Sequence, residues 1–398
     1  MTGTFAQSFT FSRNDGTTIL LTVKPHAVNL FTRPQNDLWT FDLEGRLMGM
    51  YVNGVNYRRT LSNRFYLKDR ISIDGEDYRN VTPIGLRVAG RLLAQAHRLF
   101  HEILPGLDPD ARPLVEKILL MDMGSLKAEG KAFDDIYLPI SILPPDQYMS
   151  LVIQITEGCN YNRCTFCNFY RDRPFKIKNR EEISLHLDQV LAFFGEGVRL
   201  RKSIFLADAN ALVTPQSRLR DTMELIRRKT GKSRNIYSFI DVFTGIKKSS
   251  KDFSDLAALG LNRVYLGVES GDPELLAFLH KPQATDDIVE LTKNLKLGGV
   301  NLGVIFLTGA GGEKYHSQHL DASINLLEKI PLGKGDMIYL SEFYETNPQY
   351  EYELTKHGIF QPDRQEIRKM TMEFLHRFQK FTPTGAVISP YDIQQFLY

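Results

Sequence analysis

Cysteine is scarce in this chain, which has three cysteines among 398 residues. All three, Cys159, Cys164 and Cys167, fall within a stretch of nine residues. A disulfide scaffold distributes an even number of cysteines along the chain, so this arrangement excludes one. Clustered thiols instead indicate a reducing compartment and a metal site.

Three other features are missing from the sequence. The 49 basic and 47 acidic residues leave a net charge of +2, which gives no reason to expect a broad nucleic-acid-binding surface. No apolar run is long enough to cross a bilayer. Residues 1–24 are polar and mixed, without a basic segment followed by an apolar one, so no secretory signal is expected. The expectation is a cytoplasmic protein without a membrane partner.

The first part of the chain, residues 1–145, is expected to form a mixed α+β region of unassigned role. Short alternating stretches between residues 17 and 80 are separated by Gly, Asn and Asp, which predicts several short strands. Within 84–121, apolar residues recur at three- and four-residue spacing, which predicts helices.

After residue 148 the pattern changes to strands that alternate with amphipathic segments. Short apolar runs predict strands at 150–156, 202–206, 235–240, 263–268, 301–307 and 336–343. Such alternation predicts an α/β fold with a parallel sheet, closed into a full or partial (β/α)6 TIM-like barrel. We expect the core at 146–350 and a C-terminal helical extension at 351–398, with a helix at 363–381.

The cysteine spacing is C-x4-C-x2-C, just after the first strand of this repeat. Thiolates separated by two to four residues can converge on one metal centre. Three interpretations remain open from the residues alone: buried structural thiols, a zinc site with His316 or His319 as fourth ligand, and a [4Fe–4S] cluster with three protein ligands.

The flanking residues resemble the radical S-adenosylmethionine (SAM) superfamily. Thr156-Glu157-Gly158-Cys159-Asn160 is similar to the T-x-G-C-N segment of that family, and Phe166 precedes the last cysteine, where the family places an aromatic residue near adenine. The usual spacing there is C-x3-C-x2-C, one residue shorter. The resemblance implies a single [4Fe–4S] cluster on Cys159, Cys164 and Cys167, with one iron open to SAM.

Further segments carry the resemblance downstream, over residues 148–345. It implies that Ala207-Asp208-Ala209-Asn210 receives the SAM amino group and that Glu269-Ser270 meets the ribose. It also implies that Lys281 meets the SAM carboxylate, while the strand carrying Ile305 and Leu307 borders the adenine. On the third strand, Ser238 or Asp241 is expected to face SAM.

The implied activity is reductive cleavage of SAM to a 5′-deoxyadenosyl radical, which abstracts hydrogen from an unidentified substrate. A low-potential electron donor of flavodoxin or ferredoxin type would supply the electron. The alternatives are a non-catalytic iron–sulfur electron-transfer or sensor protein and a zinc-binding module. Six residues at the mouth of the barrel are candidates for substrate contact, although a loop with packing aromatics is the favoured interpretation for most of them: Tyr339, Glu342, Phe343, Tyr344, Glu345 and Asn347. A basic run after the cysteines would meet a donor protein or a phosphate, or be a solvated loop: Arg171, Arg173, Lys176, Lys178 and Arg180.

Overall fold

The computed structural model describes residues 6–73, 76–231, 234–344, 347–382 and 385–398. The chain divides into two compact units. The first comprises residues 1–140, 188–202 and 394–398, and the second comprises residues 141–187 and 203–393.

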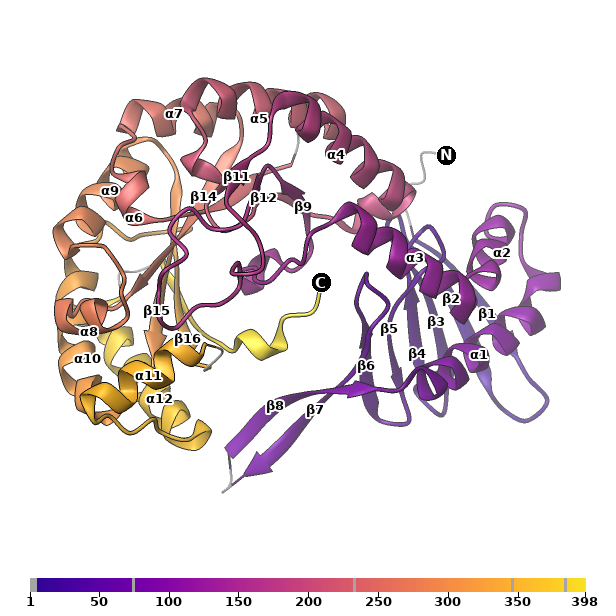
Figure 1. Ribbon diagram of the computed structural model, residues 1–398. Helices are drawn as coiled ribbons and strands as arrows, with labels where there is room; N and C mark the ends of the chain where they lie inside the picture. The colour runs from indigo at the N-terminus through magenta and orange to yellow at the C-terminus, as the bar shows by residue number, and fades with distance from the viewer. Residues whose placement is uncertain (1–5, 74–75, 232–233, 345–346, 383–384) are drawn as a thin grey trace. The chain divides into compact units, whose positions relative to one another are not determined.

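The first unit contains an antiparallel sheet in which each strand pairs with the next along the chain (Figure 1). Its strands are β1 (Gln7–Ser12), β2 (Thr18–Val23), β3 (Val28–Arg33), β4 (Leu38–Phe41), β5 (Leu47–Val52), β6 (Val55–Arg59), β7 (Phe65–Ile73) and β8 (Glu76–Ile84). The turn between β5 and β6 is Asn53-Gly54, with φ angles of 51° and 78°. Positive φ at both central residues is typical of a tight hairpin turn whose twist matches that of the strands.

Helices of this unit cover one face of the sheet. They are α1 (Leu86–Ile103), α2 (Arg112–Leu120) and α3 (Met123–Ile136). The apolar side of α1 packs on the sheet because Leu93, Ala96 and Phe100 share a core with Trp39. The indole nitrogen of Trp39 donates to the carbonyl of Leu92 at 3.1 Å. The predicted strands and the helical character of 84–121 are confirmed, whereas α3 was not predicted.

The second unit is built on a parallel sheet in the order β17-β16-β15-β14-β13-β12-β9. Its strands are β9 (Ser150–Gln154), β12 (Ser203–Ala207), β13 (Ile236–Ile240), β14 (Leu261–Glu269), β15 (Asn301–Thr308), β16 (Met337–Glu342) and β17 (Val387–Tyr391). Among the described residues β9 and β17 are the edges, so the sheet is a partial barrel. The predicted α/β class and the six predicted strands are confirmed, and β17 is an unpredicted seventh.

Helices connect successive strands of this sheet. They are α4 (Arg180–Phe194), α5 (Gln216–Thr230), α6 (Val242–Gly245), α7 (Ser250–Ala258), α8 (Pro273–Phe278), α9 (Thr285–Leu297), α10 (Gly312–Lys329), α11 (Pro348–His357) and α12 (Arg364–Phe381). In Figure 1, α5, α7, α9 and α10 follow one another around the outside of the strands. A small ladder of β10 (Thr156–Glu157) and β11 (Lys176–Ile177) brackets the cysteine segment. No helix in the described part of the chain is long and apolar enough to span a membrane.

Candidate active site

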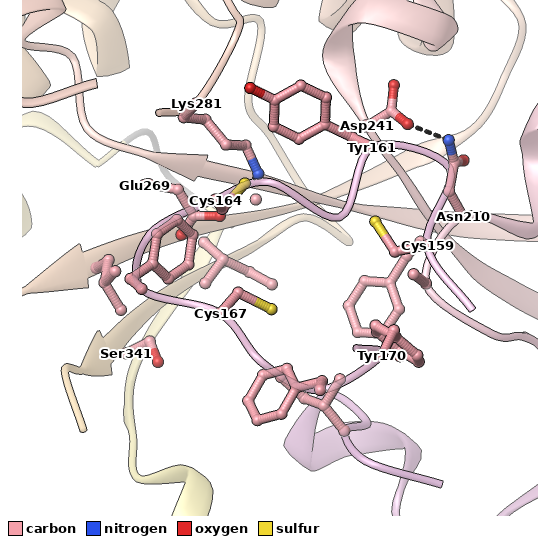
Figure 2. Close-up of a pocket in the computed structure, with 18 of the residues that line it drawn as sticks. Cys159, Tyr161, Cys164, Cys167, Tyr170, Asn210, Asp241, Glu269, Lys281 and Ser341 are labelled. Atoms are coloured by element: carbon pink, nitrogen blue, oxygen red, sulfur yellow. Dashed lines mark hydrogen bonds and ion pairs between the residues drawn. The ribbon is translucent and has the colours of Figure 1, made fainter. Parts of the chain in front are cut away.

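The three cysteines lie on the loop between β10 and β11, and all line one cavity of about 210 Å³. Figure 2 shows their sulfur atoms directed into the same space. The cavity opens at the carboxyl ends of the parallel strands, since Glu269 ends β14 and Leu307 stands one residue before the end of β15. That edge is where barrels of alternating strands and helices place their active sites.

Several contacts hold the cysteine loop in place. The backbone N–H and the hydroxyl of Thr165 donate to the carbonyls of Leu279 and Phe278, at 3.1 and 3.3 Å. The ring of Phe166 packs against an apolar cluster formed by residues of α8, α11 and neighbouring segments. The Tyr161 hydroxyl donates to the carbonyl of His280 at 2.9 Å. The loop is therefore anchored to the segment that follows β14.

Burial favours the neutral thiol form of two of the cysteines, Cys164 and Cys167. Burial raises the pKa of Cys164 to about 11, against the opposing charge of Lys281, and burial raises the pKa of Cys167 to about 12. A metal centre binds the thiolate form, so loading this site releases protons. Three thiols on one loop, facing one cavity, are a donor set that fits an iron–sulfur cluster with one iron free of protein ligands.

The segment at the end of β12, residues 207–210, lies only partly in the cavity wall. Ala209 and Asn210 line the cavity, whereas Ala207 and Asp208 do not. The buried Asp208 carboxylate accepts from Gln154 Nε2 at 2.8 Å and from the N–H of Gly158 at 3.1 Å. Burial raises the pKa of Asp208, and these hydrogen bonds oppose that effect. Its position beside Gly158 makes Asp208 a support of the cysteine loop.

Asn210 and Asp241 form a polar corner of the cavity. The Asn210 amide nitrogen donates to Asp241 Oδ2, as Figure 2 shows, and to Thr244 Oγ1 at 2.8 Å. Asn160 Nδ2 donates to the same Asp241 oxygen at 3.1 Å. Asn210 Oδ1 is buried and accepts no hydrogen bond from the described residues. Buried polar atoms are normally paired, so this oxygen is a candidate acceptor for a ligand.

Glu269 and Lys281 form an ion pair in the cavity wall. Lys281 Nζ lies 3.1 Å from Glu269 Oε1, and the two side chains are 13% and 9% exposed. Burial alone would lower the pKa of Lys281, but Glu269 and Cys164 outweigh it and raise that pKa above its ordinary value. The ammonium group therefore stays charged. Figure 2 shows its nitrogen beside the sulfur of Cys164.

The remaining predicted residues fall into two groups. Phe166, Ile305 and Leu307 line the cavity. Ser238 and Ser270 do not line it and are fully buried. The Ser238 hydroxyl donates to the carbonyl of Leu206 at 3.0 Å, and Ser270 Oγ lies 2.7 Å from His319 Nδ1. Both serine hydroxyls therefore form hydrogen bonds inside the protein and do not face the cavity.

The two histidines considered as zinc ligands lie outside the cavity lining. His316 Nε2 pairs with Glu373 at 2.8 Å, and His319 Nε2 bonds to the carbonyl of Leu307 at 3.1 Å. Among the described residues, no group of three or more His, Cys, Asp or Glu side chains is close enough to hold a single metal ion. In a cluster, by contrast, each thiolate binds a separate iron.

The residues predicted to contact substrate at the mouth of the barrel do not all line the cavity. Glu342, Phe343 and Tyr344 line the cavity together with Ser341. The Tyr339 hydroxyl instead donates to Asp146 Oδ1 at 2.7 Å. Asn347 caps the start of α11 and contacts the cysteine loop, while Glu345 lies outside the described residues. The sequence did not single out several aromatic residues that line the cavity: Phe169, Tyr170, Phe239, Phe243 and Tyr391. Phe169 and Tyr170 stand two and three residues after Cys167, so their closeness to the cysteine motif was the one available signal.

The basic run after the cysteines is largely paired. Arg173 contacts Asp172 at 3.0 Å and Asp208 at 3.5 Å. Lys176 lies 2.5 Å from Glu182, and Lys178 lies 3.6 Å from Glu157. These basic side chains are therefore paired with acidic residues of the protein itself.

Residues 153–322 match the family model described as the radical SAM superfamily. This part of the chain is therefore a radical SAM domain, and its superfamily uses a [4Fe–4S] cluster and SAM.

One curated relative is the 4′-phospho-dehydrooxetanocin synthase of Priestia megaterium. It is 24% identical over 233 residues, which cover 54% of this chain and 31% of that protein. The chain thus spans about a third of the length of the curated relative it matches.

Among solved structures, the chain is similar to coproporphyrinogen III oxidase (HemN) from Escherichia coli, a radical SAM enzyme, with 13% identity and a TM-score of 0.44. That match covers 58% of this chain and 52% of the other. A second match, to HydG, a maturase of the [FeFe]-hydrogenase, has 14% identity and a TM-score of 0.40, over 76% and 70% of the two chains.

Proposed function

We propose that this protein is an enzyme that binds a [4Fe–4S] cluster through Cys159, Cys164 and Cys167 and cleaves SAM reductively to act on a substrate in the same cavity. One observation carries the proposal. The three thiols and the Glu269–Lys281 pair line a single cavity at the carboxyl ends of a parallel sheet. An electron carrier needs the thiols alone, whereas the buried ion pair beside them provides polar groups for a second ligand.

Each group has a role that follows from its chemistry. The Lys281 ammonium would attract the carboxylate of SAM, and Glu269 would accept hydrogen bonds from ribose hydroxyls. The free Asn210 Oδ1 and the backbone near Ala209 would receive the SAM amino group. Phe166, Ile305 and Leu307 supply apolar surface for the adenine. When bound, the cluster and SAM would supply a 5′-deoxyadenosyl radical that takes a hydrogen atom from the substrate.

We propose that the rest of the cavity wall contacts the substrate. Ser341, Phe343, Tyr344 and Tyr391 lie on it, from β16, the segment after it, and β17. The reaction also requires a reductant, and we propose a low-potential donor of flavodoxin or ferredoxin type in the cytoplasm. The synthase reaction of the curated relative is not carried over, because the match covers 31% of that protein.

Anaerobic reconstitution tests the proposal. The protein is loaded with iron and sulfide, reduced with dithionite and mixed with SAM, and 5′-deoxyadenosine is quantified. We expect about four irons per chain and 5′-deoxyadenosine formation in the wild type. Cys164→Ala should lose the iron and the product while keeping the wild-type circular dichroism spectrum.

The alternatives give different results in the same experiment. A fully loaded, reducible cluster that yields no 5′-deoxyadenosine would support an electron carrier or sensor and reject the enzyme. One tightly bound zinc and no brown colour would support a zinc module.

A further inference from the structure

The backbone carbonyls of two cysteines are held by side chains from two directions. Asn347 Nδ2 donates to the carbonyl of Cys167 at 3.2 Å and reaches that of Cys164 at 3.5 Å. Arg171 donates to the same two carbonyls, from Nε to Cys167 at 3.2 Å and from Nη2 to Cys164 at 3.1 Å. We refer to Asn347 and Arg171 as the carbonyl clamp.

Asn347 is fixed at both ends of its amide. Its Oδ1 accepts from the N–H of Gln349 at 3.1 Å and thereby caps the N-terminus of α11. The residue is 6% exposed, so its hydrogen bonds are shielded from competing water. Arg171 is exposed, and its contribution is weaker for that reason.

The same helix also supports the loop through apolar contacts. Tyr350 and Leu354 of α11 belong to the apolar cluster on which Phe166 packs, and Phe166 stands between the two clamped cysteines. Within the loop, the N–H of Cys167 donates to the carbonyl of Cys164 at 3.3 Å. The clamp therefore acts on a turn whose geometry sets the directions of both thiols.

We propose that Asn347, assisted by Arg171, is a positioning residue that holds the cysteine loop in its cluster-binding conformation before the cluster is present. The proposal rests on the proposed function, since it assigns the thiols to a cluster. Outer partners that orient metal ligands commonly change metal retention when they are removed. Ordering the loop in advance lowers the conformational entropy lost when the ligands bind. The clamp also ties the cysteine loop to α11.

Two substitutions separate the clamp from the helix cap. Asn347→Asp keeps a good capping oxygen but has no donor for the carbonyls. Asn347→Ser also caps a helix, but its side chain is too short to reach them. The matched control is Asn179→Asp, because the Asn179 side chain caps the start of α4 by accepting from Glu182 N–H at 2.9 Å.

The first measurement is hydrogen exchange of the full-length, metal-free chain, followed by mass spectrometry. In both Asn347 variants, peptides covering 159–171 should exchange about fivefold faster than in the wild type, as the loss of one or two hydrogen bonds predicts. Peptides covering α11 should stay at the wild-type rate, and Asn179→Asp should leave the loop unchanged. Unchanged exchange of the loop would overturn the proposal. Equally faster exchange in the loop and in α11 would also overturn it, because that result would mean that Asn347 only caps the helix.

The second measurement is iron release from the reconstituted proteins to a chelator. The Asn347 variants should release iron several-fold faster than the wild type and the Asn179→Asp control, and Arg171→Lys should have a smaller effect. Release at the wild-type rate would reject the positioning role. The exchange measurement needs no cofactor, so its failure is distinguishable from failure of the proposed function, which would show as absence of 5′-deoxyadenosine from the wild-type enzyme.

Discussion

At the scale of single residues, the Glu269–Lys281 pair gives a sharp prediction. Both side chains are largely buried, so removing one partner leaves the other charge uncompensated. Lys281→Met should lower the free energy of unfolding by about 3–5 kcal/mol. The double variant Glu269→Gln/Lys281→Met should be less destabilised than Lys281→Met alone. Urea unfolding of the three proteins at neutral pH measures this, and a double variant at least as unstable as Lys281→Met would contradict it.

Some site residues could be predicted from the sequence and others could not. The cysteines and Glu269 stand in short local motifs at strand ends, and a strand end fixes which edge of the sheet they occupy. Whether a side chain there faces the cavity depends on local turns, and so Asp208 lies beneath the loop while Asn210 lines the cavity. Asn347 contacts a segment 180 residues earlier in the chain, which no local pattern records.

At the scale of elements, the contact between β14 and β15 depends on a glycine. Gly303 pairs with Tyr265 in the parallel register, and a Cβ atom at Gly303 would lie 2.3 Å from Tyr265 Cδ1. Tyr265 cannot move freely, because it is fully buried and its hydroxyl donates to Asp146 Oδ2 at 2.6 Å. Gly303→Ala should therefore destabilise the protein by about 1–3 kcal/mol through overpacking.

The control for that substitution is Gly333→Ala, since nothing lies within 4 Å of a Cβ atom at Gly333. Urea midpoints followed by far-ultraviolet circular dichroism compare the two variants with the wild type. Equal midpoints for Gly303→Ala and Gly333→Ala would show that the sheet accommodates the methyl group.

The elements that were predicted share a physical signature. Strands such as β9 and β12 are buried at every position, so they read as continuous apolar runs between polar segments. By contrast, β17 has exposed or half-buried positions and contains Pro390, which a strand tolerates at the edge of a sheet. Helix α11 carries Tyr352 and His357 on exposed surface, and the sequence predicted it only as part of a helical extension at 351–398.

At the scale of the whole molecule, the alternation of strands and helices was enough to predict the parallel partial barrel, because crossover connections have a fixed hand. The antiparallel sheet of the first unit could be predicted only as a set of short strands. Its pairing order depends on turns such as Asn53-Gly54, where both residues adopt positive φ angles.

At the scale of the whole molecule, a buried histidine should make the stability of the protein depend on pH. His319 joins three segments of the second unit: its ring contacts Ser270 Oγ at 2.7 Å, Ser323 Oγ at 3.1 Å and the Leu307 carbonyl at 3.1 Å. Burial lowers the pKa of His319 to about 4, from an ordinary value of 6.5. Between these values the unfolded chain binds a proton that the folded chain does not, so stability falls as the pH decreases through this window.

The size of this loss of stability follows from the pKa shift of His319. Between pH 7 and pH 5, the wild type should lose about 2 kcal/mol through His319. The His319→Gln variant should be less stable than the wild type at pH 7, because the buried hydrogen bonds of His319 are disrupted. Between pH 7 and pH 5, however, its free energy of unfolding should fall by about 2 kcal/mol less than that of the wild type. Urea unfolding at both pH values should be followed by circular dichroism, since the single tryptophan, Trp39, reports on the first unit. Parallel losses in the two proteins would show that His319 is not the group responsible.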